Sequence, residues 1–211
     1  APPNRPFVPP RSEMLLFGEG TSPMPIPDWR VLLEGFGELP TLEFVVRCAR
    51  RVQPLFLTAW PDAPQRLYQL LDGAIETVEE ITTGKERTTS TFAFNAMSAV
   101  KAASKAGVPQ AACVASTVAC ATYALTAVGY GDLSITHAAQ AAEYAVESFG
   151  YGNNSDQRAA QRSLIAAMES DIAQLREWTN AGHRDGPLPP GTLGPLWPDE
   201  EPEYVVRIPF H

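Results

Sequence analysis

Alanine and proline occupy different parts of this chain, and that division constrains the fold more than any motif does. Residues 92–146 hold 18 alanines in 55 positions, whereas 15 of the 20 prolines lie in residues 1–28 and 182–211. Small side chains let helices approach closely, while proline is excluded from helix interiors and favours extended chain. The sequence therefore predicts a close-packed helical centre between two extended, proline-rich arms.

The longest uncharged stretch, residues 106–131, is long enough to cross a bilayer. It consists mainly of Ala, Ser, Thr, Gln and Gly, with four Val, one Leu and no Ile or Phe. Insertion of such a segment into a membrane would be only marginally favourable. We therefore expect the central helix of a soluble bundle and no membrane contact.

Apolar residues spaced at the helical period, together with boundary residues, divide the rest of the chain into helices. Asp28 and Thr41 are expected N-caps of the first two, and Asp132 or Ser134 is the expected N-cap of a later one. Pro54 should kink or end the second helix, whose side opposite the apolar stripe carries Arg47, Arg50 and Arg51. The expected ranges are about 29–36, 41–56, 64–81, 85–105, 109–129, 132–149 and 156–179.

The predicted fold class is therefore all-α. We expect one domain, a bundle of six or seven helices over residues 29–181, with an N-terminal arm (1–28) and a C-terminal arm (182–211). Both arms carry apolar residues, so we expect them to pack on the body of the protein or on a partner. Tyr204–Ile208 could add a short strand.

Charge and cysteine content exclude some functions and leave others open. The net charge of −8 argues against nucleic-acid binding, which requires clustered Lys and Arg. Cys48, Cys113 and Cys120 show no metal-binding spacing, and the interpretation is three reduced, buried thiols in a cytoplasmic protein. Neither a phosphate-binding loop nor a metal motif is present, so we expect no cofactor and no metal.

An enzymatic alternative depends on the cysteines and one histidine. Cys113 or Cys120 could act as a nucleophile with His137 as its base, because their helices are expected to be neighbours. Neither cysteine stands at an expected helix N-terminus, and no orienting carboxylate is evident. Our expectation is that the protein is not an enzyme.

A row of carboxylates is the strongest candidate for a binding site. Asp72, Glu76, Glu79 and Glu80 should line one side of a helix, where they could imitate a phosphate backbone and attract a basic protein. Aromatic residues commonly dominate interface energetics. The candidate aromatic contacts are Trp29, Trp60 and Trp197.

Part of the chain resembles a known family. The matching features are Cys48-Ala49-Arg50-Arg51-Val52-Gln53-Pro54-Leu55-Phe56, the Pro61-Asp62 turn, Ala74-Ile75-Glu76, and alanine-rich helices with a histidine. Over about residues 44–146 the chain resembles predicted all-helical bacterial immunity proteins encoded beside polymorphic toxins. The resemblance implies a non-catalytic role and carries over no catalytic residue.

Two functional hypotheses without catalysis follow. The first is a protein-binding protein, such as an immunity protein that neutralises a basic toxin through the acidic helical face. The second is a structural or scaffold subunit whose arms embrace neighbouring subunits, including further copies of itself. The unrecognised Cys/His enzyme remains a third hypothesis.

Overall fold

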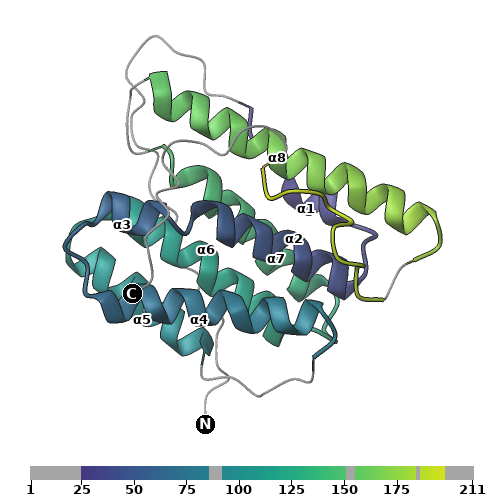
Figure 1. Ribbon diagram of the computed structural model, residues 1–211, viewed down its shortest axis with the longest axis horizontal. Helices are drawn as coiled ribbons and strands as arrows, with labels where there is room; N and C mark the ends of the chain where they lie inside the picture. The colour runs from purple at the N-terminus through teal and green to yellow at the C-terminus, as the bar shows by residue number, and fades with distance from the viewer. Residues whose placement is uncertain (1–24, 86–91, 151–154, 184–185, 198–211) are drawn as a thin grey trace.

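The computed structural model describes residues 25–85, 92–150, 155–183 and 186–197, with side chains from Asn95 onward in the second of these segments. These segments are helical and contain no strand, which confirms the predicted all-α class (Figure 1). The helices are α1 (Trp29–Leu33), α2 (Glu38–Val52), α3 (Leu55–Ala59), α4 (Gln65–Thr82), α5 (Phe92–Lys105), α6 (Pro109–Thr126), α7 (Asp132–Glu147) and α8 (Ser155–Asn180).

Helix α6 is the central helix of the bundle. It packs against α2, α3, α4, α5 and α7, and its side chains are buried around most of its circumference. Its hydroxyls bond within the helix: Thr117 Oγ1 donates to the Cys113 carbonyl at 3.1 Å, and Thr122 Oγ1 to the Ala119 carbonyl at 2.7 Å. Because its side chains are small and these hydroxyls are bonded within the helix, α6 can be packed on most sides by other helices. The prediction that this segment is the central helix of the bundle is confirmed.

Among the described residues, none of the helices combines the length and the hydrophobicity needed to cross a bilayer.

Helix α8 lies along one edge of the bundle and contacts α2 and α7 (Figure 1). Its predicted apolar stripe is buried and includes Leu164, Met168, Ile172 and Leu175, while Trp178 at its end is only half-buried. Asp171 lies within this stripe and is 1% exposed. Burial of a carboxylate requires partners that compensate its charge, and these come from α2.

Two expected helix starts are wrong. Helix α2 begins at Glu38 with Gly37 as its N-cap, because a proline such as Pro40 is tolerated in the first turn of a helix. Thr41 therefore lies inside the helix and donates to the Gly37 carbonyl. Helix α7 is capped by Gly131 rather than by Asp132 or Ser134, and the buried Ser134 hydroxyl instead donates to the Ala124 carbonyl of α6 at 3.1 Å. The Asp28 N-cap is confirmed by its bond from the Val31 amide.

Some expectations lie outside the described residues. These are residues 1–24 of the N-terminal arm, the start of the helix expected from residue 85, and residues 198–211 with the Tyr204–Ile208 strand. The longer described part of the C-terminal arm, residues 186–197, contains neither helix nor strand and is bonded by side chains of α2 and α8. We call residues 186–197 the C-terminal strap.

Candidate functional site

Arg50 of α2 joins two of the four candidate carboxylates. Its Nε and Nη2 donate to the two oxygens of Glu79, each at 2.6 Å, and its Nη1 donates to Asp72 Oδ1 at 2.6 Å. Gln53 Nε2 also donates to Asp72 Oδ1, at 2.9 Å. Asp72 and Glu79 are two helical turns apart, so one guanidinium can reach both from the neighbouring helix. The result is a bidentate clamp that holds α4 against α2.

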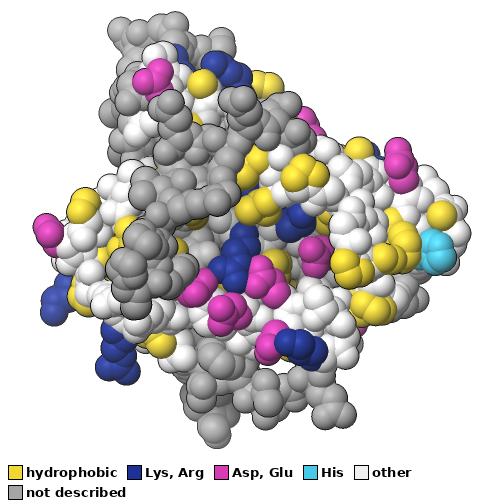
Figure 2. All heavy atoms as spheres, viewed as in Figure 1, with side chains coloured by type: hydrophobic (Ala, Val, Ile, Leu, Met, Phe, Trp, Pro, Cys, Tyr) yellow, Lys and Arg dark blue, Asp and Glu magenta, His cyan; other side chains and the backbone are white. Residues whose placement is uncertain are grey.

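The electrostatics of this clamp follow from its partial burial. Burial acts to lower the pKa of the Arg50 guanidinium, but hydrogen bonds and charge from Glu79 and Asp72 outweigh it and raise the pKa above its ordinary value. The guanidinium therefore stays charged. Figure 2 shows acidic and basic side chains gathered at the centre of this face, over α2 and α4.

The other two candidate carboxylates point outward. Glu76 and Glu80 are exposed on α4, and Glu80 pairs with Lys85 at 2.8 Å. We define the α4 acidic face as Asp72, Glu76, Glu79 and Glu80. The four carboxylates thus do not form a uniformly solvated row, because Arg50 takes two of them and leaves Glu76 and Glu80 toward solvent.

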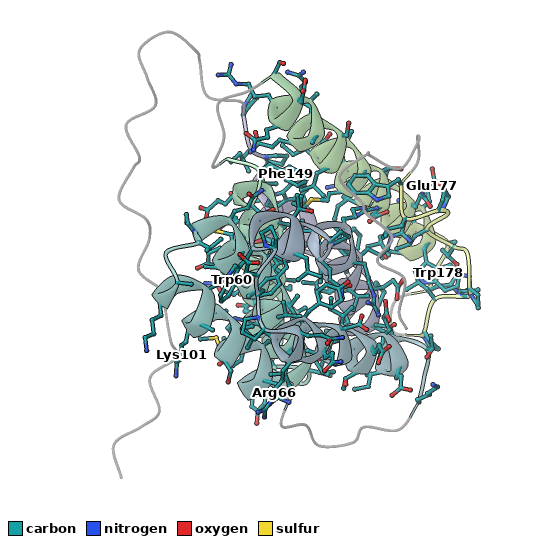
Figure 3. The ribbon with its side chains drawn as sticks, turned by 60° about the vertical axis from the view of Figure 1, so that its left-hand side comes forward. Trp60, Arg66, Lys101, Phe149, Glu177 and Trp178 are labelled. Atoms are coloured by element: carbon teal, nitrogen blue, oxygen red, sulfur yellow. The ribbon has the colours of Figure 1, made fainter. Side chains whose placement is uncertain are left out.

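The three candidate tryptophans do not share this surface. Trp29 is 1% exposed and packs on Phe44, with ring centroids 6.1 Å apart, and Trp197 is 7% exposed. The expectation that both offer exposed aromatic contacts is therefore wrong: each fills the core. Trp60 is half-buried, with its ring 6.0 Å from that of Phe56. It lies beyond the end of α3, on the opposite side of the view in Figure 3 from Glu177 and Trp178 of α8.

The cysteines and His137 are placed in surroundings that oppose thiolate chemistry. Burial, and then the charge of Glu143, raises the pKa of Cys120 to about 12. Burial lowers the pKa of His137, whose Nδ1 lies 3.2 Å from Gln140 Oε1 and whose ring stands 5.5 Å from that of Tyr123. Cys113 Sγ lies 3.9 Å from Glu147 Oε2. In the described chain, no three His, Cys, Asp or Glu side chains are arranged to hold a metal ion.

A second charged cluster was missed by the sequence reasoning. Asp171 Oδ2 accepts from Arg51 Nη1 at 2.6 Å and from Arg47 Nε at 3.1 Å. Arg51 is fully buried, so the side of α2 that carries Arg47, Arg50 and Arg51 does not simply face solvent. The sequence feature that could have indicated this cluster is Asp171, a carboxylate one turn from both Met168 and Leu175 in the apolar stripe of α8. Such a residue needs a buried cationic partner.

Burial also governs the groups around this second cluster. It raises the pKa of Cys48 to about 12, although the charge of Arg51 acts in the opposite direction. It likewise raises the pKa of Glu43, against the effects of a Thr82 hydrogen bond and the charge of Arg47. The cluster therefore brings the guanidiniums of Arg47 and Arg51 to Asp171, with the Glu43 carboxyl group, whose pKa is raised, nearby.

Comparison of the chain with protein-family models, with curated proteins and with solved structures finds no match.

Proposed function

We propose that this protein is a non-catalytic protein-binding protein that docks a basic partner on the α4 acidic face. The observation that supports this proposal best is the Arg50 clamp. It fixes α4 on α2 through three short charged hydrogen bonds and leaves Glu76 and Glu80 outward. Because α4 is already fixed on α2, its backbone loses little conformational freedom when a partner binds, so more of the attraction to Glu76 and Glu80 is available for association.

The net charge balance of this face suits a cationic partner. Among the described residues, its four carboxylates form ion pairs with Arg50 and Lys85, and two positive charges against four negative ones leave the face negative. Complementary charge mainly raises the association rate and selects against acidic partners. A basic toxin, as the resemblance to immunity proteins implies, is the partner class that we propose.

The test uses proteins encoded by the genes that flank this one as candidate partners. Association is measured by titration calorimetry and stopped-flow kinetics with wild type and with E76Q/E80Q. We expect the double variant to bind about tenfold more weakly at low salt, mainly through a slower association rate, and the difference should shrink as salt screens the charges.

A matched control removes the same charge elsewhere. Glu169 and Glu177 are exposed on α8, and Glu177 lies at the far end of that helix (Figure 3). E169Q/E177Q should leave the association rate almost unchanged. Equal loss in both double variants would mean that only overall charge matters, and a salt-independent loss would contradict the electrostatic proposal.

A further inference from the structure

The backbone of the C-terminal strap is held by side chains of the helices beneath it. Arg47 donates to the carbonyls of Leu193 at 3.2 Å, Gly194 at 3.3 Å and Pro195 at 2.6 Å. Arg51 Nε donates to the Leu196 carbonyl at 2.8 Å. With its NH2 group turned toward the strap, Gln174 of α8 donates to the carbonyls of Thr192 at 2.9 Å and Leu193 at 3.1 Å. Side chains of the body thus bind five consecutive carbonyls.

Two side chains of the strap enter the apolar interior. Leu193 is 4% exposed and Trp197 is 7% exposed, and both belong to the main hydrophobic core. The Trp197 ring also packs on the guanidinium of Arg51, whose carbon lies 5.7 Å from the ring centroid. Between these two anchors, Gly194 and Pro195 are exposed. This arrangement is that of a bound peptide: buried side chains four residues apart, joined by backbone that is recognised through its carbonyls.

The strap is rich in hydrogen-bond acceptors, and the side chains that bind its backbone, those of Arg47, Arg51 and Gln174, act as donors. Pro187, Pro189, Pro190 and Pro195 have no backbone N–H, so the strap presents more acceptors than donors. Guanidinium groups donate only, and the amide of Gln174 donates in the orientation that binds the strap. We define the peptide groove as the site formed by Arg47, Arg51, Asp171 and Gln174 together with the apolar surface that receives Leu193 and Trp197.

The strap leaves part of the peptide groove unused. Arg51 Nη2 is buried and donates to no acceptor among the described residues. Among the described residues, the two guanidiniums of the groove form ion pairs with one carboxylate, that of Asp171, and the Glu43 carboxyl group near Arg47 has a raised pKa. A peptide that adds a carboxylate at this point would supply the missing acceptor, which residues 186–197 do not contain.

We propose that the peptide groove binds an extended, proline-containing segment of another protein, and that the strap occupies it in cis as a pseudo-ligand. The segment would carry a leucine and an aromatic residue four positions apart, as Leu193 and Trp197 do, with an acidic residue near Arg51. This site lies on α2 and α8 and is separate from the α4 acidic face.

The sequence of the strap favours a foreign segment over one exchanged between copies of this chain. Residues 186–197 contain no Asp or Glu, so the same segment from a second copy would leave Arg51 Nη2 without an acceptor, as the strap in place does among the described residues. A foreign segment with an acidic residue at this point would supply the acceptor.

The test compares the wild-type full chain with L193S/W197S, which removes the two anchors and leaves the side chains of the groove unchanged. The probe is a fluorescein-labelled peptide with the sequence of residues 186–197, blocked at both ends, and binding is followed by anisotropy. We expect saturable binding to L193S/W197S and binding at least about tenfold weaker to wild type, because the attached strap competes at high effective concentration. A second peptide with Glu added directly after Trp197, which keeps the leucine and the tryptophan four positions apart, should bind more tightly.

Two controls locate the binding. A peptide carrying serine at positions 193 and 197 should not bind, and R47A added to L193S/W197S should weaken binding at least about tenfold. If L193S/W197S is helical by circular dichroism and binds no peptide, the proposal is wrong and the strap only seals the core. If wild type forms a dimer with exchanged straps, the occupant is a second copy and the proposal of a foreign segment is overturned.

A second design covers the case in which L193S/W197S does not fold. A protease site inserted between Gly186 and Pro187 lets the strap be cut in wild type without removing it. Exchange of the cut strap for the labelled peptide supports the proposal. Loss of helicity on cutting that the added peptide does not restore overturns it.

Discussion

Removal of the Asp171 carboxylate is the most informative single change to the fold. Asp171 is 1% exposed and compensates Arg51, which is fully buried, and Arg47. In Asp171→Ala two guanidiniums lose their counter-ion, one of them without access to water. Breaking a buried ion pair in this way costs about 3–5 kcal/mol, a large part of the roughly 5–15 kcal/mol that stabilises a typical domain.

Asp72→Ala is the matched control, because Asp72 also accepts from an arginine at 2.6 Å but its side chain and that of Arg50 are 21% and 23% exposed. Water can replace part of this interaction, so we expect a loss of about 1 kcal/mol. The assay is urea unfolding followed by circular dichroism at pH 7. For a chain of this size, the Asp171→Ala loss corresponds to a melting temperature lower by roughly 6–20 °C.

The reasoning also predicts coupling between the partners. Arg51→Met removes the buried cation, so the combination of Arg51→Met with Asp171→Ala should cost clearly less than the sum of the two single losses. If Asp171→Ala costs no more than Asp72→Ala, or if the double variant is additive, then water reaches this cluster and the strap does not seal it.

Three further outcomes can be measured. Ala142→Leu should destabilise the fold by about 1–3 kcal/mol in urea unfolding because Ala142 is fully buried, whereas Ala173→Leu at an exposed position of α8 should change stability little. Burial raises the folded-state pKa of Glu43 above its unfolded value, so its contribution to stability is fully present below the unfolded pKa near 4.5 and is lost as pH rises through the folded pKa. Glu43→Gln should therefore stabilise the protein relative to wild type at pH 7, with a difference that vanishes near pH 4; a constant difference would contradict this. Cys120, with its pKa near 12, should react with iodoacetamide at pH 8 at least about 100-fold more slowly in the folded than in the unfolded chain, and fast labelling would favour the Cys/His enzyme hypothesis.

The helices could be predicted because local sequence determines them. The apolar stripe of α8 and the lack of charged residues in α6 both indicate buried surfaces, and these surfaces are buried in the structure. Helix starts were less accessible to prediction. Gly37 and Gly131 cap α2 and α7 without a side-chain bond, while the hydroxyls of Thr41 and Ser134 bond elsewhere. A hydroxyl near a helix start has several backbone acceptors within reach, and sequence does not say which one it takes.

The charged clusters could be predicted only in part, since they depend on contacts between distant residues. The spacing of Asp72 and Glu79 indicates a shared side of α4, but nothing local indicates that Arg50 meets them there. Arg51 and Asp171 are 120 residues apart in sequence. Burial of Trp197 could not be predicted either. Its place in a proline-rich arm suggests an exposed aromatic residue, but it is buried because the strap packs on α2 and stacks the ring on Arg51.

Helix α2 connects the two surfaces that we propose. Arg50 projects toward α4, and Arg47 and Arg51, one turn apart, project toward α8 and the strap. These three arginines meet three carboxylates, Asp72, Glu79 and Asp171, so their charges cancel within the fold. The net charge of −8 must therefore reside on the rest of the chain, where it remains available to attract a basic partner. The same pairing fixes α2 on both sides, so a strap that leaves the peptide groove uncovers an arginine pair whose position is already set by Asp171.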